Sequence, residues 1–106
     1  MKNVIYIDVD DTIVRSAGAK RIPITKVISK IKELAQSGNI IYLWSRGGSS
    51  YAKDTAVEFE IDKCITGFLP KPNIIIDDQN LIDWKFLKQI HPNEISNMLI
   101  DSPGDA

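Results

Sequence analysis

Residues 6–12 read YIDVDDT, a short apolar segment that runs into three carboxylates within four positions. Carboxylates so close together repel one another and resist burial, so the stretch needs either open solvent or a cation. The residues before it, 4–7, form a continuous apolar run of the kind found in buried strands. We therefore expect the acids to stand at the carboxyl end of a strand.

Further short apolar runs with polar or turn residues at their ends predict other buried strands. The clear ones are residues 40–44 and 74–76, and a weaker one lies near Cys64 and Ile65. Two helices are predicted, one before and one after the strand at residues 40–44. The first has Thr25 as its N-cap and stops at Gly38, and the second runs from Ser49 or Ser50 to about Glu60.

The apolar residues of each predicted helix share one face, which we expect to point inward. They are Val27, Ile28, Ile31, Leu34 and Ala35 in the first helix and Tyr51, Ala52, Ala56 and Phe59 in the second. Strands that alternate with helices predict an α/β fold built from right-handed βαβ units, with a parallel sheet covered by helices.

In three segments the apolar residues follow neither a helical nor a strand period. Residues 13–24 contain Gly18 and Pro23 and predict a loop or a small hairpin. The stretch after Asp83 is ambiguous between a short helix, an extra strand and a packed tail, and we expect the last six residues to be frayed.

Length and composition limit the classes of protein that the chain can belong to. At 106 residues it fits one domain, residues 1–106, with the tail beyond about residue 95 the least defined part. A net charge of -1 argues against a general nucleic-acid binder. No apolar run approaches the roughly 20 residues of a membrane span, and the N-terminus lacks the apolar region of a secretory signal. We expect a cytoplasmic protein without a membrane partner, and a nucleic-acid partner is disfavoured.

The single cysteine and the single histidine exclude several kinds of site. Cys64 has no partner for an internal disulfide or a thiolate-rich metal site, and we expect a buried, reduced thiol. His91 stands beside a proline, so a two-histidine zinc site or a Ser-His-Asp triad has little support.

Polar residues follow the predicted strands at the ends where ligands bind in parallel sheets. They are Asp8, Asp10 and Asp11 after the first strand, Ser45 and Arg46 after the second, and Asp77 and Asp78 after the last. The candidate chemistry therefore gathers at one edge of the sheet.

The order of these residues resembles the four motifs of the haloacid dehalogenase (HAD) superfamily of aspartate-nucleophile phosphohydrolases. DVDDT at 8–12 matches the first motif, YLWS at 42–45 the second, Lys71 the third, and IIIDDQNLID at 74–83 the fourth. The resemblance implies a Rossmann-like three-layer αβα sandwich with a central parallel sheet. We expect it to be capless, because residues 13–24 and 46–70 leave no room for a cap domain.

Carried over by position, the resemblance implies a role for each residue of the site. Asp8 resembles the nucleophile that becomes an aspartyl phosphate, and Asp10 resembles the general acid/base. Ser45 would donate to the phosphoryl oxygens, while Lys71 would offset their charge and restrain the nucleophile. Arg46 is a further candidate for substrate binding.

The resemblance also implies bound Mg²⁺, which would relieve the repulsion among the acids. Its ligands would be the Asp8 carboxylate, the Asp10 carbonyl, Asp78 and a substrate oxygen. Asp77 would bind the metal directly or through water, or orient the lysine. Asp83 matches a further acid of the fourth motif or is a residue at a helix start.

These features predict a Mg²⁺-dependent phosphatase that acts on a small phosphorylated metabolite such as a sugar phosphate. Asp10 favours a phosphatase over a dehalogenase, whose leaving group needs no proton. A phosphorylated polynucleotide end or a phosphoprotein is the alternative substrate, and Arg15, Lys20 and Arg21 are either contacts to an anionic leaving group or solvated charges. A capless site is open, so it takes a bulky partner or borrows a lid from a neighbouring subunit of a homo-oligomer.

Two readings from other classes remain. A response-regulator receiver domain shares the carboxylates, Mg²⁺, hydroxyl and lysine, but it places its lysine after the last acid, whereas Lys71 precedes Asp77 and Asp78. A HAD fold retained only to bind phosphate is the second, and it is disfavoured because every catalytic position is filled.

Overall fold

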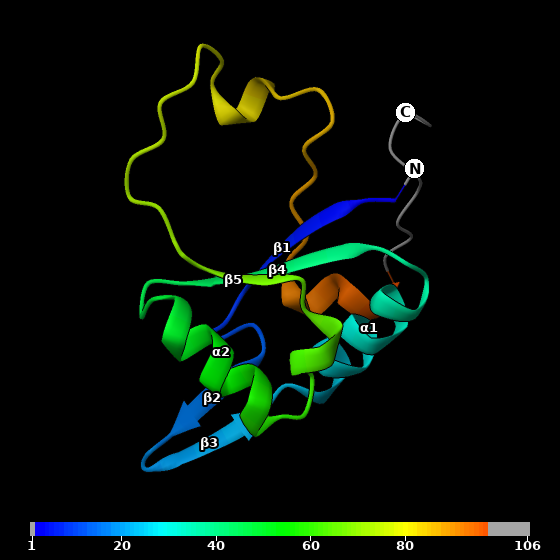
Figure 1. Ribbon diagram of the computed structural model, residues 1–106, viewed down its shortest axis with the longest axis vertical. Helices are drawn as coiled ribbons and strands as arrows, with labels where there is room; N and C mark the ends of the chain where they lie inside the picture. The colour runs from blue at the N-terminus through cyan, green and yellow to red at the C-terminus, as the bar shows by residue number, and fades with distance from the viewer. Residues whose placement is uncertain (1, 98–106) are drawn as a thin grey trace.

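The computed structural model describes residues 2–97, which are built around a three-stranded parallel sheet (Figure 1). Its strand order is β1 (Val4–Asp8), β4 (Ile40–Ser45) and β5 (Gly67–Pro70). Asp8 stands beside Trp44, and Ser45 stands beside Pro70. The carboxyl ends of the three strands therefore meet at one edge, and the α/β class and the parallel sheet are confirmed.

Two helices cover one face of this sheet. Helix α1 (Thr25–Gln36) precedes β4 and helix α2 (Ser49–Glu58) follows it, and both lie on the same side of the strands in Figure 1. Burial alternates along the strands, so that Ile7, Ile41 and Leu43 are buried on the helix side. They pack in one cluster with apolar residues of both helices, as the helical spacing predicted.

The ends of α1 are set by the chain on either side of it. The prediction of Thr25 as N-cap is wrong, because Ile24 holds that position and no side chain caps the helix. Ile24 packs on the core and its N–H donates to the Ile13 carbonyl at 2.7 Å, so burial and a backbone bond fix this end. The predicted stop is confirmed: Gly38 has φ +84°, a conformation that favours glycine.

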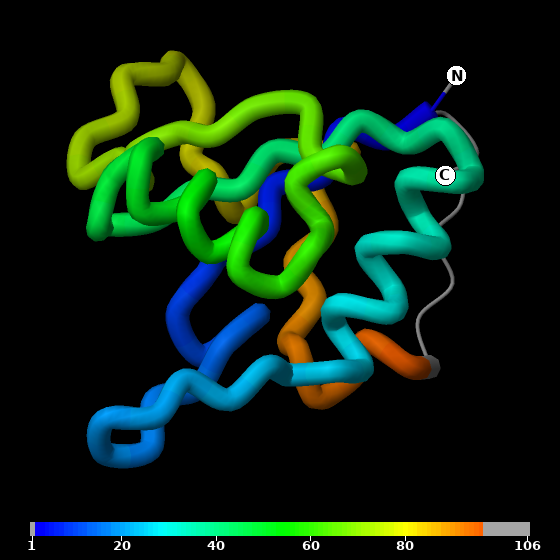
Figure 2. The backbone as a smooth tube through the Cα atoms, turned by 60° about the horizontal axis from the view of Figure 1, so that its bottom comes forward, coloured from blue at the N-terminus to red at the C-terminus, as the bar shows by residue number. Residues whose placement is uncertain are grey.

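Residues 13–24 contain a hairpin. Strand β2 (Val14–Ala17) pairs antiparallel with β3 (Lys20–Pro23) around a turn in which Gly18 has φ +63°. Figure 2 shows this hairpin projecting from the body of the molecule. The stretch after Asp83 contains a short helical turn, η3 (Pro92–Asn97), which packs near α1. The last six residues lie outside the described residues.

The weak strand expected near Cys64 and Ile65 is displaced. Asp62–Cys64 forms a short helical turn, η1, and the strand begins only at Gly67. A Cβ at Gly67 would stand 2.9 Å from the ring of Tyr42, its neighbour across the ladder. The close approach of this ring selects glycine as the first residue of the strand.

The strand predicted at residues 74–76 is wrong for this structure. The ladder of β5 ends at Pro70, and Pro70 and Pro72 both lack an N–H with which to extend it. The chain then leaves the sheet in a long loop that carries one short helical turn, η2 (Leu81–Asp83) (Figures 1 and 2). The three isoleucines are exposed by 74%, 48% and 96%, as expected of a segment with no strand beside it.

The face of the sheet opposite the helices is apolar and partly open. Val4, Tyr6 and Ile40 are exposed there by 60%, 47% and 39%. The Tyr6 ring contacts those of Tyr42 and Trp44, with centroids 5.3 and 5.0 Å apart. Within residues 2–97, helices α1 and α2 thus cover one face of the sheet and leave the other partly open. None of these helices is long and apolar enough to cross a membrane.

Candidate functional site

The end of β1 and the start of the segment after β5 bring two predicted site residues together. The Lys71 N–H donates to the Ser45 carbonyl at 2.8 Å, which places the lysine at the edge where the strands end. Its side chain reaches Asp8, with Nζ 3.6 Å from Oδ1. The side chains of Lys71 and Asp8 are 33% and 34% exposed, so this pair of charges is accessible to a ligand.

The Lys71 ammonium group also lies against an aromatic ring. Its Nζ is 5.9 Å from the centroid of the Trp44 ring, close enough for a weak cation–π attraction. Trp44 stands beside Asp8 in the sheet, so the ring and the carboxylate limit the space that the lysine can occupy. The cation is therefore directed to the carboxyl edge by two neighbours.

Ser45 and Arg46 lie in the turn after β4. Ser45 is buried, and its Oγ accepts a hydrogen bond from the Gly47 N–H at 3.0 Å. Because that bond uses a lone pair of the hydroxyl, its proton remains for another acceptor. Arg46 is exposed, and within residues 2–97 no ion pair or hydrogen bond holds its guanidinium group.

Asp10 stands on a tight turn that is anchored in the core. The N–H groups of Thr12, Ile13 and Val14 all point to the Val9 carbonyl, at 3.2, 2.8 and 3.3 Å. Val9 and Ile13 are buried, whereas Asp10 is exposed. The turn thus holds the backbone of Asp10 firmly while its side chain faces outward.

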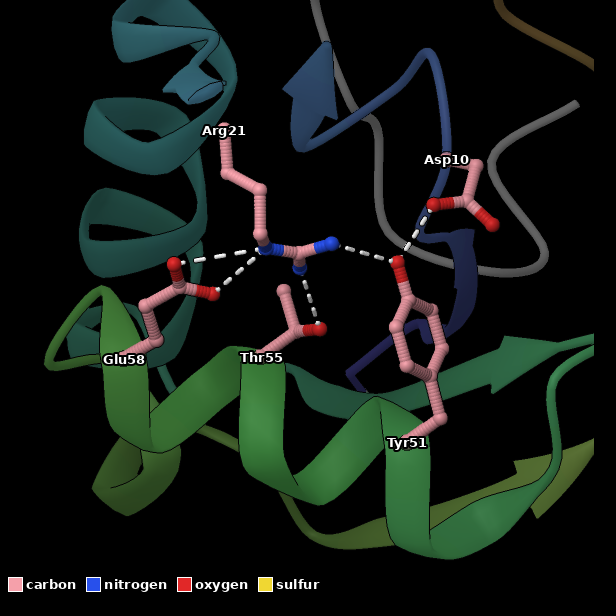
Figure 3. A network of polar contacts seen from close by, with 5 residues as sticks. All are labelled: Asp10, Arg21, Tyr51, Thr55 and Glu58. Atoms are coloured by element: carbon pink, nitrogen blue, oxygen red, sulfur yellow. Dashed lines mark hydrogen bonds and ion pairs between the residues drawn. The ribbon is translucent and has the colours of Figure 1, made fainter. Parts of the chain in front are cut away.

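A network that the sequence analysis missed contacts the Asp10 carboxylate (Figure 3). The Tyr51 hydroxyl donates to Asp10 Oδ1 at 2.6 Å, and Arg21 Nη1 donates to the Tyr51 oxygen at 2.9 Å. Arg21 also binds Thr55 Oγ1 at 3.0 Å and Glu58 at 3.0 Å. Residues 51, 55 and 58 share one face of α2 by their i, i+4, i+7 spacing, and this polar stripe is the signal that could have revealed the network.

Because of this network, Arg21 is not free to bind a substrate. Its hydrogen bond with Tyr51 is the main cause of a raised pKa of Arg21, opposed by desolvation and reinforced by Glu58. The guanidinium group is thus committed to three partners on α2 rather than to a leaving group. Arg15 and Lys20, which share the hairpin, are exposed.

The acids of the fourth motif lie apart from Asp8 and Asp10. Asp77 and Asp78 are exposed on the loop after β5, where Asp77 Oδ1 accepts from the Gln79 N–H at 2.9 Å. Asp83 lies in η2. Within residues 2–97 no three histidine, cysteine or carboxylate side chains are grouped so that they could hold a metal ion. The described arrangement therefore leaves the expected magnesium ligands unassembled.

Cys64 and His91 take structural positions. Cys64 is free and half-buried, less buried than we expected, and it packs against the core. The His91 ring accepts at Nδ1 from the Asn93 N–H at 3.1 Å, as a turn residue does.

Comparisons with models of protein families, with curated proteins and with solved structures give no match to this chain. The case for a function therefore depends on the sequence motifs together with the geometry at the carboxyl edge of the sheet.

Proposed function

We propose that this chain is a Mg²⁺-dependent phosphatase of the HAD type, which hydrolyses a phosphate monoester through an aspartyl phosphate on Asp8. One observation carries the proposal. Lys71 and Asp8, which the motifs name as a charge-offsetting lysine and a nucleophile, lie 3.6 Å apart on an accessible edge of the sheet. A cation beside a carboxylate there favours the approach of an anionic phosphate.

In the proposed reaction a carboxylate oxygen of Asp8 forms a bond to phosphorus while the bond from phosphorus to the leaving oxygen breaks. Asp10 gives its proton to that oxygen. It then takes a proton from the water that attacks phosphorus, and this second step releases inorganic phosphate and restores Asp8. The Ser45 hydroxyl, Lys71 and Arg46 bind the phosphoryl oxygens.

The expected ligands have the donor chemistry that Mg²⁺ prefers, and the acids of the fourth motif would have to approach the edge from the loop after β5. The Asp8 carboxylate and the Asp10 carbonyl are hard oxygen donors at the end of one strand, and Asp77 and Asp78 add two exposed carboxylates. We propose these four as the residues that hold the ion, with Asp78 the direct ligand of the second pair. When bound, the ion supplies positive charge that offsets the repulsion between carboxylate and phosphate.

We further propose that the loop after β5, with residues 74–76, covers the open face of the sheet, which would give the third layer of the sandwich. Three observations support this. β1 is an edge strand of the described sheet, the face beside it exposes Val4 and Tyr6, and all three isoleucines are exposed. Burial of one such side chain stabilises a fold by about 1.5–3 kcal/mol, so the apolar surfaces favour association.

The proposed substrate is a small phosphorylated metabolite such as a sugar phosphate, for which the open site would borrow a lid from a neighbouring subunit. Arg46 is an exposed cation directly after β4, and Arg15 and Lys20 are exposed on the hairpin that follows the Asp10 turn. The test is a panel of phosphate esters that contains sugar phosphates, a phosphorylated oligonucleotide end and a phosphopeptide, each assayed with Mg²⁺ and with EDTA. We expect Mg²⁺-dependent turnover, fastest with the sugar phosphates.

The decisive variant is Asp8→Asn, with Asp54→Asn as its matched control on the exposed surface of α2. Loss of a nucleophile costs on the order of 10⁴-fold or more in kcat, so Asp8→Asn should be inactive while Asp54→Asn keeps the wild-type rate. Retention of more than about a hundredth of the activity by Asp8→Asn would mean that another group attacks phosphorus. Undiminished turnover in EDTA would remove Mg²⁺ from the proposal.

A further inference from the structure

We infer that Tyr51 is a positioning residue that holds one oxygen of Asp10 and leaves the other for the substrate, and that Arg21 acts through Tyr51. The inference rests on the proposed function, in which Asp10 transfers the proton. Asp10 Oδ1 accepts the Tyr51 hydroxyl at 2.6 Å, and no other hydrogen bond between described residues reaches this carboxylate. Oδ2 is therefore the oxygen free to face a leaving group.

The direction of the hydrogen bonds follows from the chemistry of the three groups. A guanidinium group has donors and no acceptor, so the 2.9 Å contact must run from Arg21 to the Tyr51 oxygen. The phenol has one proton, and a carboxylate accepts it at 2.6 Å. A phenol that accepts from a cation is a stronger donor, so the two bonds reinforce one another.

Tyr51 has a fixed place from which to act. A Cβ at Gly47 would stand 2.8 Å from its ring, and Gly48, with φ +99°, lets the chain enter α2 directly afterwards. The ring packs against the core, and the Arg21 guanidinium carbon lies 5.3 Å from its centroid. The hydroxyl is thus presented to Asp10 by packing rather than by the hydrogen bond alone.

Arg21 connects the Tyr51–Asp10 hydrogen bond to the hairpin. It stands on β3, while its acceptors Tyr51, Thr55 and Glu58 all stand on α2. Thr55 is buried, so this end of the guanidinium fork is anchored (Figure 3). The fork therefore fastens the hairpin to the helix and holds the charge that polarises Tyr51.

The expected consequence is an effect on proton transfer rather than on substrate binding. An exposed carboxylate without its anchor can rotate away from the leaving oxygen, and misplacement by about 1 Å can cost as much as 10²-fold in rate. Tyr51→Phe removes only the hydroxyl and keeps the ring. With an alkyl phosphate we expect kcat to fall about tenfold with little change in KM. With nitrophenyl phosphate, whose leaving group needs less protonation, the loss should be smaller.

The matched control is Tyr42→Phe, which removes the same atom from the other side of the molecule, where no hydrogen bond within residues 2–97 involves it. It should leave both substrates unaffected. Asp10→Asn abolishes the group on which Tyr51 acts, so adding Tyr51→Phe to Asp10→Asn should cost nothing further. A multiplicative loss in the double variant would show that Tyr51 acts on something other than Asp10 and would overturn the inference.

Arg21→Met tests whether Arg21 acts on Asp10 only through Tyr51. It should cause part of the Tyr51→Phe loss, and the double variant should lose no more than Tyr51→Phe alone. A larger loss for Arg21→Met than for Tyr51→Phe would mean that Arg21 reaches the substrate by another route, which contradicts the inference.

A structural measurement separates this inference from the proposed function. If the wild-type protein hydrolyses none of the phosphate esters, the proposed function fails, and crystal structures of the wild type and of Tyr51→Phe then decide whether Tyr51 positions Asp10. We expect one Asp10 side-chain conformation in the wild type and its loss in the variant. The same conformation in both would overturn the inference.

Discussion

Replacement of Lys71 by methionine should separate what the lysine does for the fold from what it does for catalysis. Methionine keeps much of the length and apolar stem of the side chain and removes its charge. The ion pair with Asp8 spans 3.6 Å, and both side chains are about one-third exposed. A partly exposed pair of this kind contributes roughly 0.2–1 kcal/mol to the free energy of unfolding, because water screens it.

The two expected magnitudes are therefore far apart. For a chain of this size a loss of about 0.5 kcal/mol lowers Tm by roughly 2–4 °C. Removal of one charged donor from the phosphoryl oxygens of the transition state costs on the order of 10²–10³-fold in kcat, or about 2.7–4 kcal/mol. Catalysis should thus lose several times more free energy than folding does.

The assay is Mg²⁺-dependent phosphatase activity measured beside thermal unfolding, with Lys30→Met as the control. Lys30 forms a comparable pair with Glu33 on α1, at 3.2 Å. We expect Lys30→Met to lower Tm by a similar amount and to keep full activity. If Lys71→Met retains activity within about threefold of the wild type, then Lys71 is a surface ion pair and the reasoning that places it in the site is refuted.

Two further predictions concern the loop after β5. Asp78→Asn should raise the half-saturating Mg²⁺ concentration more than Asp77→Asn does. Removal of an indirect ligand typically costs 10–100-fold in affinity or activity, and removal of a direct ligand costs more. The reverse order in a Mg²⁺ titration of activity would exchange the two assignments. Hydrogen exchange at residues 74–76 should slow when Mg²⁺ and inorganic phosphate are added, because the loop would then be held against the open face of the sheet. Equal exchange with and without both would contradict the proposed third layer.

The elements that the sequence predicted well are those with a strong local signal. Residues 4–7 and 40–44 are continuous apolar runs, and each became a strand extended by the polar residue that follows it, Asp8 or Ser45. Helix α1 has a clear apolar face, and Gly38, with positive φ, follows its C-cap. Apolar period and glycine conformation are properties of a few neighbouring residues, so the chain alone reveals them.

The elements that it predicted poorly depend on a partner elsewhere in the chain. Three isoleucines at 74–76 have the composition of a strand, but a strand exists only beside another, and Pro70 and Pro72 direct the chain out of the ladder first. The helix start moved from Thr25 to Ile24 because a bond to Ile13 and a buried side chain outweighed a local capping preference. Tertiary contacts decided both outcomes.

The candidate site divides along the same line. Asp8 and Lys71 were predicted as neighbours only by the motif resemblance, and the structure gives the reason why they meet. Each stands where a strand of one parallel sheet ends, and topology brings such positions to one edge. The link from Arg21 through Tyr51 to Asp10 joins a hairpin, a helix and a turn, and no rule of strand order connects the three. What the sequence does contain is the polar stripe on α2, which stands where a surface helix would ordinarily meet water. Hydroxyl and carboxylate groups on one helix face, opposite a hairpin that carries an arginine, predict hydrogen bonds between the helix and the hairpin. Here those bonds extend from Arg21 through Tyr51 to Asp10, the carboxylate to which the motifs assign proton transfer.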